Sequence, residues 1–372
     1  MGDIVQIGMG KSAREAYGLD SVAIVPSRRT RDVDEVSTHW QIDAFRFDIP
    51  MVAHPSDAIM SPRTAVAVGQ LGGLGVLDAE GLWCRYSDPE PLLEQISEKA
   101  DGATGYLQEI YAEPVRKDLI EERIRQIRDS GVTTAVRISP QHTQDLAPTV
   151  LAAGVDLLVI QGTIVSAEHV SNVDSALNLK QFIADLDTPV IVGGCADYKT
   201  ALHLMRTGAA GVIVGIGADA WSTTDRVLGI RVPMATAISD AAAARRDYLD
   251  ETGGRYVHVI ADGDVTFSGD IAKSIACGAD AVMLGEPLSG AAEAPARGAW
   301  WESVAAHPKL PRGQFAAAPE EALGTLRELL LGPADSPDGD KNLFGALRRV
   351  MAKTGYSDLK EFQKVELVLD RN

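Results

Sequence analysis

Short apolar runs rich in valine and isoleucine recur along the chain, and stretches of helical pattern separate them. Eight such runs are present, at residues 49–54, 73–78, 133–139, 157–162, 189–194, 211–216, 256–263 and 281–286. Continuous apolar runs are typical of strands that are buried on both faces. Their alternation with helices predicts parallel βαβ units, which form either a (β/α)₈ TIM barrel or a doubly wound open sheet.

The ends of three predicted helices share one pattern. Gly154, Gly208 and Gly278 each follow a helical stretch and directly precede an apolar run. Glycine after the last helical residue adopts the left-handed conformation that terminates a helix. Three similar helix-to-strand joints indicate a repeating βα architecture, and eight strands favour the closed barrel over the open sheet.

The C-terminal part of the chain departs from this repeat. Residues 295–342 carry several prolines and predict a loop-rich excursion, with a short helix near 320–331. Residues 343–372 begin as a helix again and are expected to close the barrel. No linker divides the chain, so we expect one domain over residues 1–372, with its strands between about 49 and 286.

Composition excludes several classes of partner. The chain has 372 residues, 35 basic and 52 acidic, for a net charge of −17. Such a protein repels nucleic acid and anionic lipid, and no apolar run is long enough for a membrane helix. We therefore expect a cytoplasmic protein that binds a small molecule. The run at 241–246 is a strong helix former, and its arginines Arg245 and Arg246 are expected on a solvated face.

Histidines and cysteines show no ligand spacing, so no metal site is predicted. Cys84, Cys195 and Cys277 give no disulfide framework. Cys195 follows the fifth run, at the barrel end where enzymes of this fold carry chemistry, so it is a candidate nucleophile or a small packed residue. His54 closes the first run and is a candidate ligand contact or a rim residue.

Several segments, in order, resemble the IMP dehydrogenase/GMP reductase family. They are YGLDSVAIVP at 17–26, IPMVAHPSD at 49–57, GGLGV at 72–76, VGIGADAWSTT at 214–224, PMATAI at 233–238, IADG at 260–263 and the stretch 343–367. The resemblance implies a (β/α)₈ barrel that acts on IMP or GMP with NAD or NADP. It also implies a homo-oligomer, which is a tetramer in this family, and potassium as a candidate bound ion. The space between residues 78 and 133 does not accommodate the family's paired cystathionine-β-synthase motifs, so the chain is most similar to the short branch without them.

The resemblance assigns catalysis to the loop after the sixth strand. The family's nucleophilic cysteine corresponds to Ser222, which Thr223 and Thr224 follow. A serine needs an adjacent base to act as a nucleophile, whereas a thiolate forms near neutral pH. Ser222 and Thr224 are therefore either the catalytic loop of a modified enzyme or a polar cap on the next helix.

The family's ligand-binding residues are matched at some positions of this sequence and not at others. The resemblance assigns ligand binding to Asp57, Gly215, Gly217, Asp262, Gly263 and Gly285. An aspartate at the position of Asp262 binds the ribose hydroxyls, because a carboxylate accepts two hydrogen bonds from a diol. Gly215 and Gly217 also imitate the start of a dinucleotide fingerprint, but Ala220 occupies the place of its third glycine, and a tight turn explains both glycines.

The phosphate site departs most from the family pattern. Its small residues correspond to Asp219, Ala220, Asp264 and Glu286. Three carboxylates would then face a phosphate of about −1.5 to −2 charges. At an effective dielectric near 20 and about 4 Å, each pair of unit charges costs roughly 4 kcal/mol. A bridging cation or protonation would relieve this repulsion.

The cofactor side departs too. Family residues near the nicotinamide correspond to Gln161, Gly194 and Ile213, and the family's water-activating Arg-Tyr pair has no counterpart after Gly313.

Two functions stay open. One is a purine-nucleotide oxidoreductase, and the other is a family member that has lost this reaction and binds another ligand or acts as a regulatory or structural protein.

Overall fold

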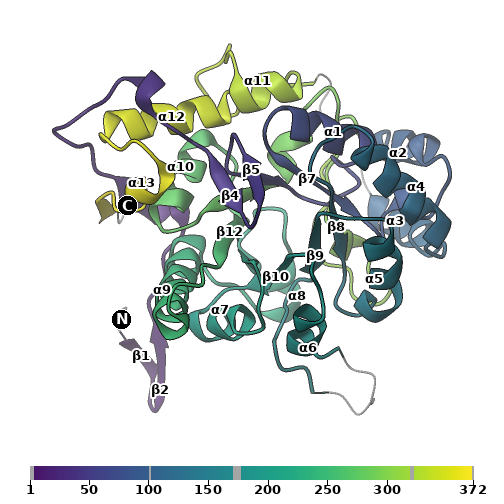
Figure 1. Cartoon of the computed structure of the whole chain (residues 1–372), viewed down its shortest axis with the longest axis horizontal. Helices are drawn as coiled ribbons and strands as arrows, with labels where there is room; N and C mark the ends of the chain where they lie inside the picture. Colours follow the sequence, from purple (N-terminus) through teal and green to yellow (C-terminus); the bar gives the residue numbers. More distant parts are fainter. Residues whose placement is uncertain (1–3, 100–101, 171–176, 319–321, 371–372) are drawn as a thin grey trace.

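The computed structural model describes residues 4–99, 102–170, 177–318 and 322–370, and a closed barrel of eight parallel strands forms its centre (Figure 1). The strands are β6 (Met51–Ala53), β7 (Leu74–Asp78), β8 (Ala135–Ile138), β9 (Leu157–Gln161), β10 (Val190–Cys195), β11 (Gly211–Val214), β12 (His258–Asp262) and β13 (Ala281–Leu284). Each strand pairs with the next, and β13 pairs with β6 to close the barrel. The open sheet is excluded, and all eight predicted strands are confirmed; β10 is shifted by one residue, and the other seven are shorter than predicted.

Burial explains why these segments are strands. Every residue of β6, β7, β9, β10, β11 and β13 is buried. One face of each strand fills the barrel interior and the other packs under helices, so neither face needs polar side chains.

Helices surround the barrel (Figure 1). The principal ones are α1 (Pro62–Gln70), α4 (Lys117–Arg128), α5 (Thr143–Ala152), α6 (Leu179–Ala184), α7 (Tyr198–Met205), α9 (Met234–Thr252), α10 (Ser268–Ala276) and α12 (Leu343–Lys353). Gly154, Gly208 and Gly278 follow three of them with φ of 84°, 99° and 117°. The predicted left-handed helix ends are therefore confirmed. No helix within the described ranges has the length and apolar content that crossing a membrane requires.

A small hairpin covers the N-terminal end of the barrel. It consists of β4 (Trp40–Ile42) and β5 (Phe45–Phe47). The Trp40 indole donates a hydrogen bond to His258 Nδ1 at 3.1 Å, at the start of β12. Ile42 is fully buried and lies against Gly211, the first residue of β11. Ligands therefore reach the barrel from its C-terminal end.

The prediction for Arg245 is wrong. Arg246 on α9 is exposed, but Arg245 is buried and its guanidinium lies 2.5 Å from a carboxylate oxygen of Asp280. Asp280 directly precedes β13 and is also buried. The helix pattern did not reveal this ion pair, because its partner lies 35 residues further along the chain.

The loop-rich excursion at residues 295–342 follows the last barrel strand in the chain and contains buried residues of its own. Trp300 and Trp301 are 2% and 0% exposed. The helix predicted near 320–331 is α11 (Leu326–Leu331), and residues 319–321 lie outside the described ranges. The closing segment contains α12, the short α13 (Leu359–Phe362) and β14 (Leu367–Leu369), which pairs with β3 (Val22–Ile24) near the start of the chain.

Candidate functional site

A pocket opens at the C-terminal ends of the strands, where the sequence predicted the site. It lies among the ends of β9, β11, β12 and β13 and the loops that follow them. Nine of the predicted residues line it: Gly215, Gly217, Asp219, Ser222, Thr224, Asp262, Gly263, Gly285 and Glu286. Residues that are separated by 70 positions in the chain meet here, because parallel strands bring their C-terminal ends to one face.

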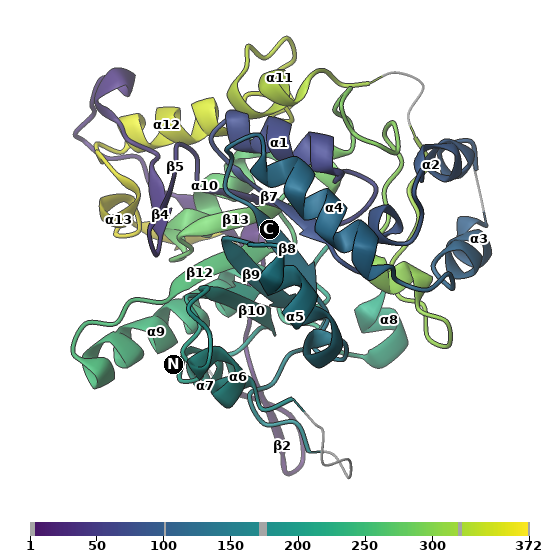
Figure 2. The ribbon, with the colours of Figure 1, turned by 45° about the vertical axis from the view of Figure 1, so that its right-hand side comes forward.

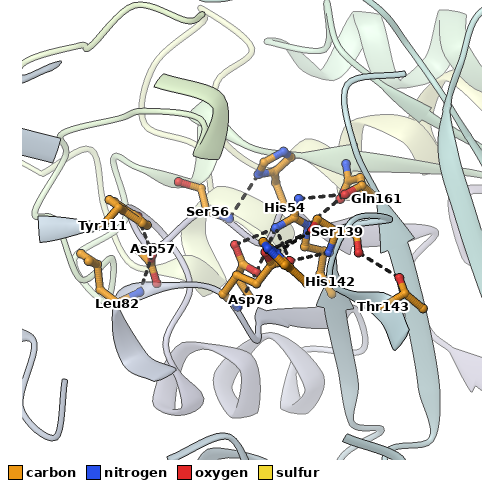
Figure 3. Close-up of polar contacts among 12 residues, drawn as sticks. His54, Ser56, Asp57, Asp78, Leu82, Tyr111, Ser139, His142, Thr143 and Gln161 are labelled. Atoms are coloured by element: carbon orange, nitrogen blue, oxygen red, sulfur yellow. Dashed lines mark hydrogen bonds and ion pairs between the residues drawn. The ribbon is translucent and has the colours of Figure 1, made fainter. Parts of the chain in front are cut away.

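Four other predicted residues do not line this pocket: Asp57, Ala220, Asp264 and Cys195. Asp57 is buried behind it, where one carboxylate oxygen accepts hydrogen bonds from the Tyr111 hydroxyl at 2.5 Å and the Leu82 amide at 2.9 Å (Figure 3). Burial and then the charge of Asp78 raise the pKa of Asp57 to about 7, although these two hydrogen bonds lower it.

Tight backbone geometry accounts for the two glycines after β11. A Cβ at Gly215 would lie 1.6 Å from the carbonyl oxygen of Asp262, and one at Gly217 would lie 2.5 Å from that of Ile230. Gly217 also has a φ of 66°. Any side chain at either position would displace neighbouring backbone, so the turn alone requires glycine.

Ser222 has no activating base. Its hydroxyl donates to Thr224 Oγ1 at 3.2 Å and accepts from the Thr224 amide at 3.3 Å, at the first residue of helix α8 (Thr224–Leu228). Among the described residues, neither a histidine, a lysine nor a carboxylate hydrogen-bonds to this hydroxyl. The geometry is that of a polar turn leading into a helix.

The loop of Ser222 is also joined to the excursion by hydrogen bonds. Thr223 Oγ1 accepts from the Gly313 amide at 2.7 Å, and the Trp221 carbonyl accepts from the Gln314 amide at 2.7 Å. These two bonds hold the segment at Gly313 against the loop after β11.

Cys195 is a packed residue in this structure. Its side chain is 1% exposed, and its thiol donates to the Ile213 carbonyl at 3.5 Å. Burial, with a contribution from Asp197, raises the pKa of the Cys195 thiol to about 12. A neutral thiol without access to the pocket is a poor nucleophile.

Carboxylic acids dominate the mouth of the pocket. Asp219 follows β11, Asp262 ends β12, Glu286 follows β13, and Glu302 comes from the excursion. Burial is the largest cause of a raised pKa in each, and it brings Asp262 to about 7 and Glu302 to about 8. Asp219 adds to the increase in Asp262, Glu286 and Glu302.

Asp264 belongs to the same group although it lies beside the pocket. Its pKa is raised to about 6, first by burial and then by Asp219, while Arg231 opposes the increase. Asp264 has a φ of 54°, in the left-handed region that glycine favours. The charge of Asp219 thus acts on four other acids.

Basic groups around the pocket do not neutralise these acids. The Arg137 guanidinium lies 3.1 Å from Asp78 and 3.5 Å from Glu80, and it donates to the Gln161 carbonyl at 2.8 Å. His54 Nδ1 accepts from the Ser56 amide at 3.2 Å (Figure 3). Burial and then the charge of Arg137 lower the pKa of His54 to about 3, so its imidazole is neutral.

Ser139 and His142 lie side by side (Figure 3) and both contact Glu80, which pairs with Arg137, but they do not form a catalytic triad. Ser139 Oγ lies 3.2 Å from His142 Nδ1, and the same nitrogen contacts Glu80 Oε1. A triad requires the serine and the acid on opposite ring nitrogens. These contacts instead fix Glu80 against the Ser139 amide and hydroxyl.

The nicotinamide side of the site does not fit NAD(P) in the manner that the resemblance implies. Gln161 Nε2 donates to Asp262 at 3.0 Å, so this side chain turns toward the acids. Gly194 exchanges backbone hydrogen bonds with the loop at Gly162, and Ile213 is fully buried inside the barrel. Gly194 and Ile213 present no polar side chain to a dinucleotide, and the amide of Gln161, which lines the pocket, is held by Asp262 where the family has a carboxylate.

Sequence reasoning missed Glu302 and Arg137 as pocket residues. Arg137 lies in the middle of an apolar strand, and such a strand charge is itself a signal, since it must be paired when buried. Glu302 lies in the aperiodic excursion, where no pattern assigns a direction to a side chain.

Comparisons with known proteins agree with this architecture. The model of the IMP dehydrogenase / GMP reductase domain matches residues 16–314. The chain is 59% identical to an uncharacterized oxidoreductase of Mycolicibacterium smegmatis, over 98% of this chain and 100% of that protein. A crystal structure of an IMP dehydrogenase/GMP reductase-like protein from Corynebacterium glutamicum is 53% identical, with a TM-score of 0.93 over 99% of this chain and 98% of that one. An inosine-5'-monophosphate dehydrogenase of Thermoplasma acidophilum is 39% identical over 41% of this chain and 29% of its own length.

Proposed function

The chain belongs to the IMP dehydrogenase/GMP reductase family, and within it we propose a member that binds a small ligand without a phosphate group and does not oxidise IMP through a covalent adduct. The observation that carries this proposal is the set of four acids around the pocket, Asp219, Asp262, Glu286 and Glu302, at the end where the family's nucleotide would lie. The absence of an activated nucleophile at Ser222 supports the second half of it.

Electrostatics gives the reason. At pH 8.5 Asp262 and Glu302, with pKa values of about 7 and about 8, are mostly ionised. Each then repels a phosphate dianion by roughly 4 kcal/mol per pair of unit charges at about 4 Å. Arg137 cannot offset this repulsion, because Asp78 and Glu80 already neutralise it.

The test is a double reversal toward the small residues of the family, Asp264→Gly with Glu286→Ser. We expect IMP binding at pH 8.5, undetectable by calorimetry in the wild type, to become measurable in the double variant, because two repulsive charges are gone. The control is Glu98→Gln with Glu121→Gln, which changes the net charge equally. Both glutamates are exposed: Glu98 follows helix α2 (Glu90–Ser97), and Glu121 lies on α4. Tight IMP binding by the wild type would refute the proposal.

The second candidate is a purine-nucleotide oxidoreductase that uses IMP or GMP with NAD or NADP. Family membership and the order of the matched segments favour it. Potassium, a further family expectation, stays a prediction. Within the described ranges no cluster of three or more histidine, cysteine, aspartate or glutamate side chains is suited to hold a metal ion.

A homo-oligomer is also proposed, as is a cytoplasmic location. The hairpin of β1 (Ile4–Gly8) and β2 (Lys11–Arg14) projects from the barrel (Figure 2). Ile4, Ile7 and Met9 on it are 72%, 67% and 106% exposed. An isolated two-stranded hairpin is marginally stable in water, so a second copy that covers these side chains would stabilise it. Deletion of residues 1–14 is expected to reduce the oligomer mass in mass photometry, and an unchanged mass would exclude the hairpin as the interface.

A further inference from the structure

We propose that the pocket binds a small organic cation of the amidinium or guanidinium type, held through its N–H groups by Gln161, Asp262 and Glu302. This inference rests on the proposed function, since it names the class of ligand that a phosphate-free pocket takes. It requires a ligand that is positively charged and that donates at least two hydrogen bonds along one edge.

The first observation is an unused acceptor. Gln161 is 8% exposed and lines the pocket, and its Oε1 is buried without a hydrogen-bond partner among the described residues. Its other amide atom, Nε2, donates to Asp262 at 3.0 Å, and this bond fixes which way the amide points. A buried acceptor without a donor costs free energy, and an N–H group of a ligand would remove that cost.

The second observation is the state of the neighbouring acids. The Asp262 carboxylate accepts one hydrogen bond from Gln161, and the Glu302 carboxylate accepts none from the described residues. Asp219 also faces these acids, with one oxygen bound to the Trp221 amide at 2.6 Å. Ionised carboxylates hold several acceptor sites each, so most of the acceptor capacity of the pocket is unused.

The third observation is the shortage of positive charge. Four acids line the pocket, and the two basic groups that line it are Arg137, which Asp78 and Glu80 neutralise, and His54, which is uncharged. Arg312 lies behind Glu302 and lowers its pKa, and it donates to Thr163 at 3.1 Å. One such arginine against four acids leaves the pocket negative.

The chemistry of these groups selects the class of ligand. A planar amidinium or guanidinium presents parallel N–H groups that match a carboxylate in two bonds. The same edge supplies a donor to the Gln161 oxygen. A quaternary ammonium would satisfy the charge but not Gln161, and a neutral amide would satisfy Gln161 but not the charge.

The experiment uses benzamidine as the probe in calorimetric titrations of the full-length protein at pH 8.5, alongside benzamide, choline and IMP. Benzamide has donors without charge, and choline has charge without N–H donors. We expect benzamidine to bind at least tenfold more tightly than either. Gln161→Met and Glu302→Gln should each weaken benzamidine binding about tenfold or more, whereas Glu121→Gln on the exposed side of α4 should leave it unchanged.

Every result decides the inference. Benzamidine binding no tighter than that of benzamide or choline overturns it, as does the absence of benzamidine binding. Binding that neither pocket variant weakens, in variants whose circular dichroism and thermal transition match the wild type, places the probe elsewhere and also overturns it. Tight IMP binding in the parallel titration overturns the proposed function itself, so the two failures are distinguishable.

Discussion

Two aspartates at opposite ends of the barrel, Asp280 buried and Asp262 half-buried, have contrary electrostatics. Asp280, just before β13, accepts hydrogen bonds from the Arg245 guanidinium, the Lys360 ammonium and the Tyr256 hydroxyl, at 2.5, 2.7 and 2.7 Å. These partners outweigh burial and hold the pKa of Asp280 well below its usual range. Asp262, at the end of β12, accepts one hydrogen bond from the Gln161 amide. Burial and then the charge of Asp219 raise the pKa of Asp262 to about 7.

The difference shows that charge is neutralised at one end of the barrel and not at the other. The N-terminal end of a barrel contributes stability, and charge there is neutralised within the chain. Barrel enzymes bind ligands at the C-terminal end, and acids there without basic partners are expected to lower the stability of the free protein. A buried charge is therefore informative about function only after its partners have been counted.

The largest expected effect follows from removing the well-paired acid. Asp280→Asn leaves Arg245 buried without its counter-charge and should lower the free energy of unfolding by about 3–5 kcal/mol. Urea denaturation at pH 7.5 measures this loss. Asp262→Asn is the matched control at the other end, and there we expect no loss or a gain. Equal losses in both variants would abolish the contrast.

The next effect is the pH dependence of Glu302. In the unfolded chain this carboxyl loses its proton near its ordinary pKa of 4.5, but in the folded protein it keeps the proton up to about pH 8. Folded protein binds more protons in this window, so stability falls as pH rises from about 4.5 to 8. Glu302→Gln removes that penalty and should add on the order of 1–3 kcal/mol at pH 9.

The control for Glu302→Gln is the comparison of the variant with the wild type at acidic pH. At pH 4 the wild-type carboxyl is protonated in both states, so the variant and the wild type should have nearly equal free energies of unfolding. Thermal melts across pH 4 to 9 measure both limits. A gain that is the same at every pH would assign the effect to packing and not to charge.

A smaller effect isolates the role of Asp219. Its charge raises the pKa of Asp262, Asp264, Glu286 and Glu302, each after burial. Asp219→Asn should therefore lower the titration midpoints of all four, measured by carbon NMR of the side-chain carboxyls. The midpoint of Asp118 on the exposed side of α4 serves as the internal reference. Unmoved midpoints in the pocket would show that the acids do not interact.

The smallest effect concerns Ser222. Its hydroxyl contacts only Thr224 among the described side chains, so Ser222→Ala should change the free energy of unfolding by less than about 1 kcal/mol. It should also leave benzamidine affinity at its wild-type value. A large loss of ligand binding in this variant would move the functional centre to the loop after β11.

The fold was predictable because its signals are local. Strand runs such as 157–162 and helix ends such as Gly154 depend on burial and on backbone conformation within a few residues. Two of the pocket acids followed from the same source, since Asp262 and Glu286 lie at the C-terminal ends of predicted strands. The resemblance then assigned Ser222 and Asp219 to the mouth of the barrel, where both lie.

The rest depends on contacts between distant segments. Glu302 reaches the pocket from an aperiodic stretch, and Arg245 meets Asp280 across 35 positions. Neither periodicity nor composition encodes such pairs. The excess of acid over base in the pocket could be recognised only after Arg137 was found paired with Asp78 and Glu80.

The central claim is that the C-terminal pocket rejects a nucleotide phosphate. Calorimetric titration of the wild-type protein with IMP and with GMP at pH 8.5, each with and without NAD(P) and potassium, tests it most directly. We expect no detectable binding of either nucleotide under any of these conditions. Micromolar binding of IMP or GMP would contradict it and would return the protein to the nucleotide oxidoreductases.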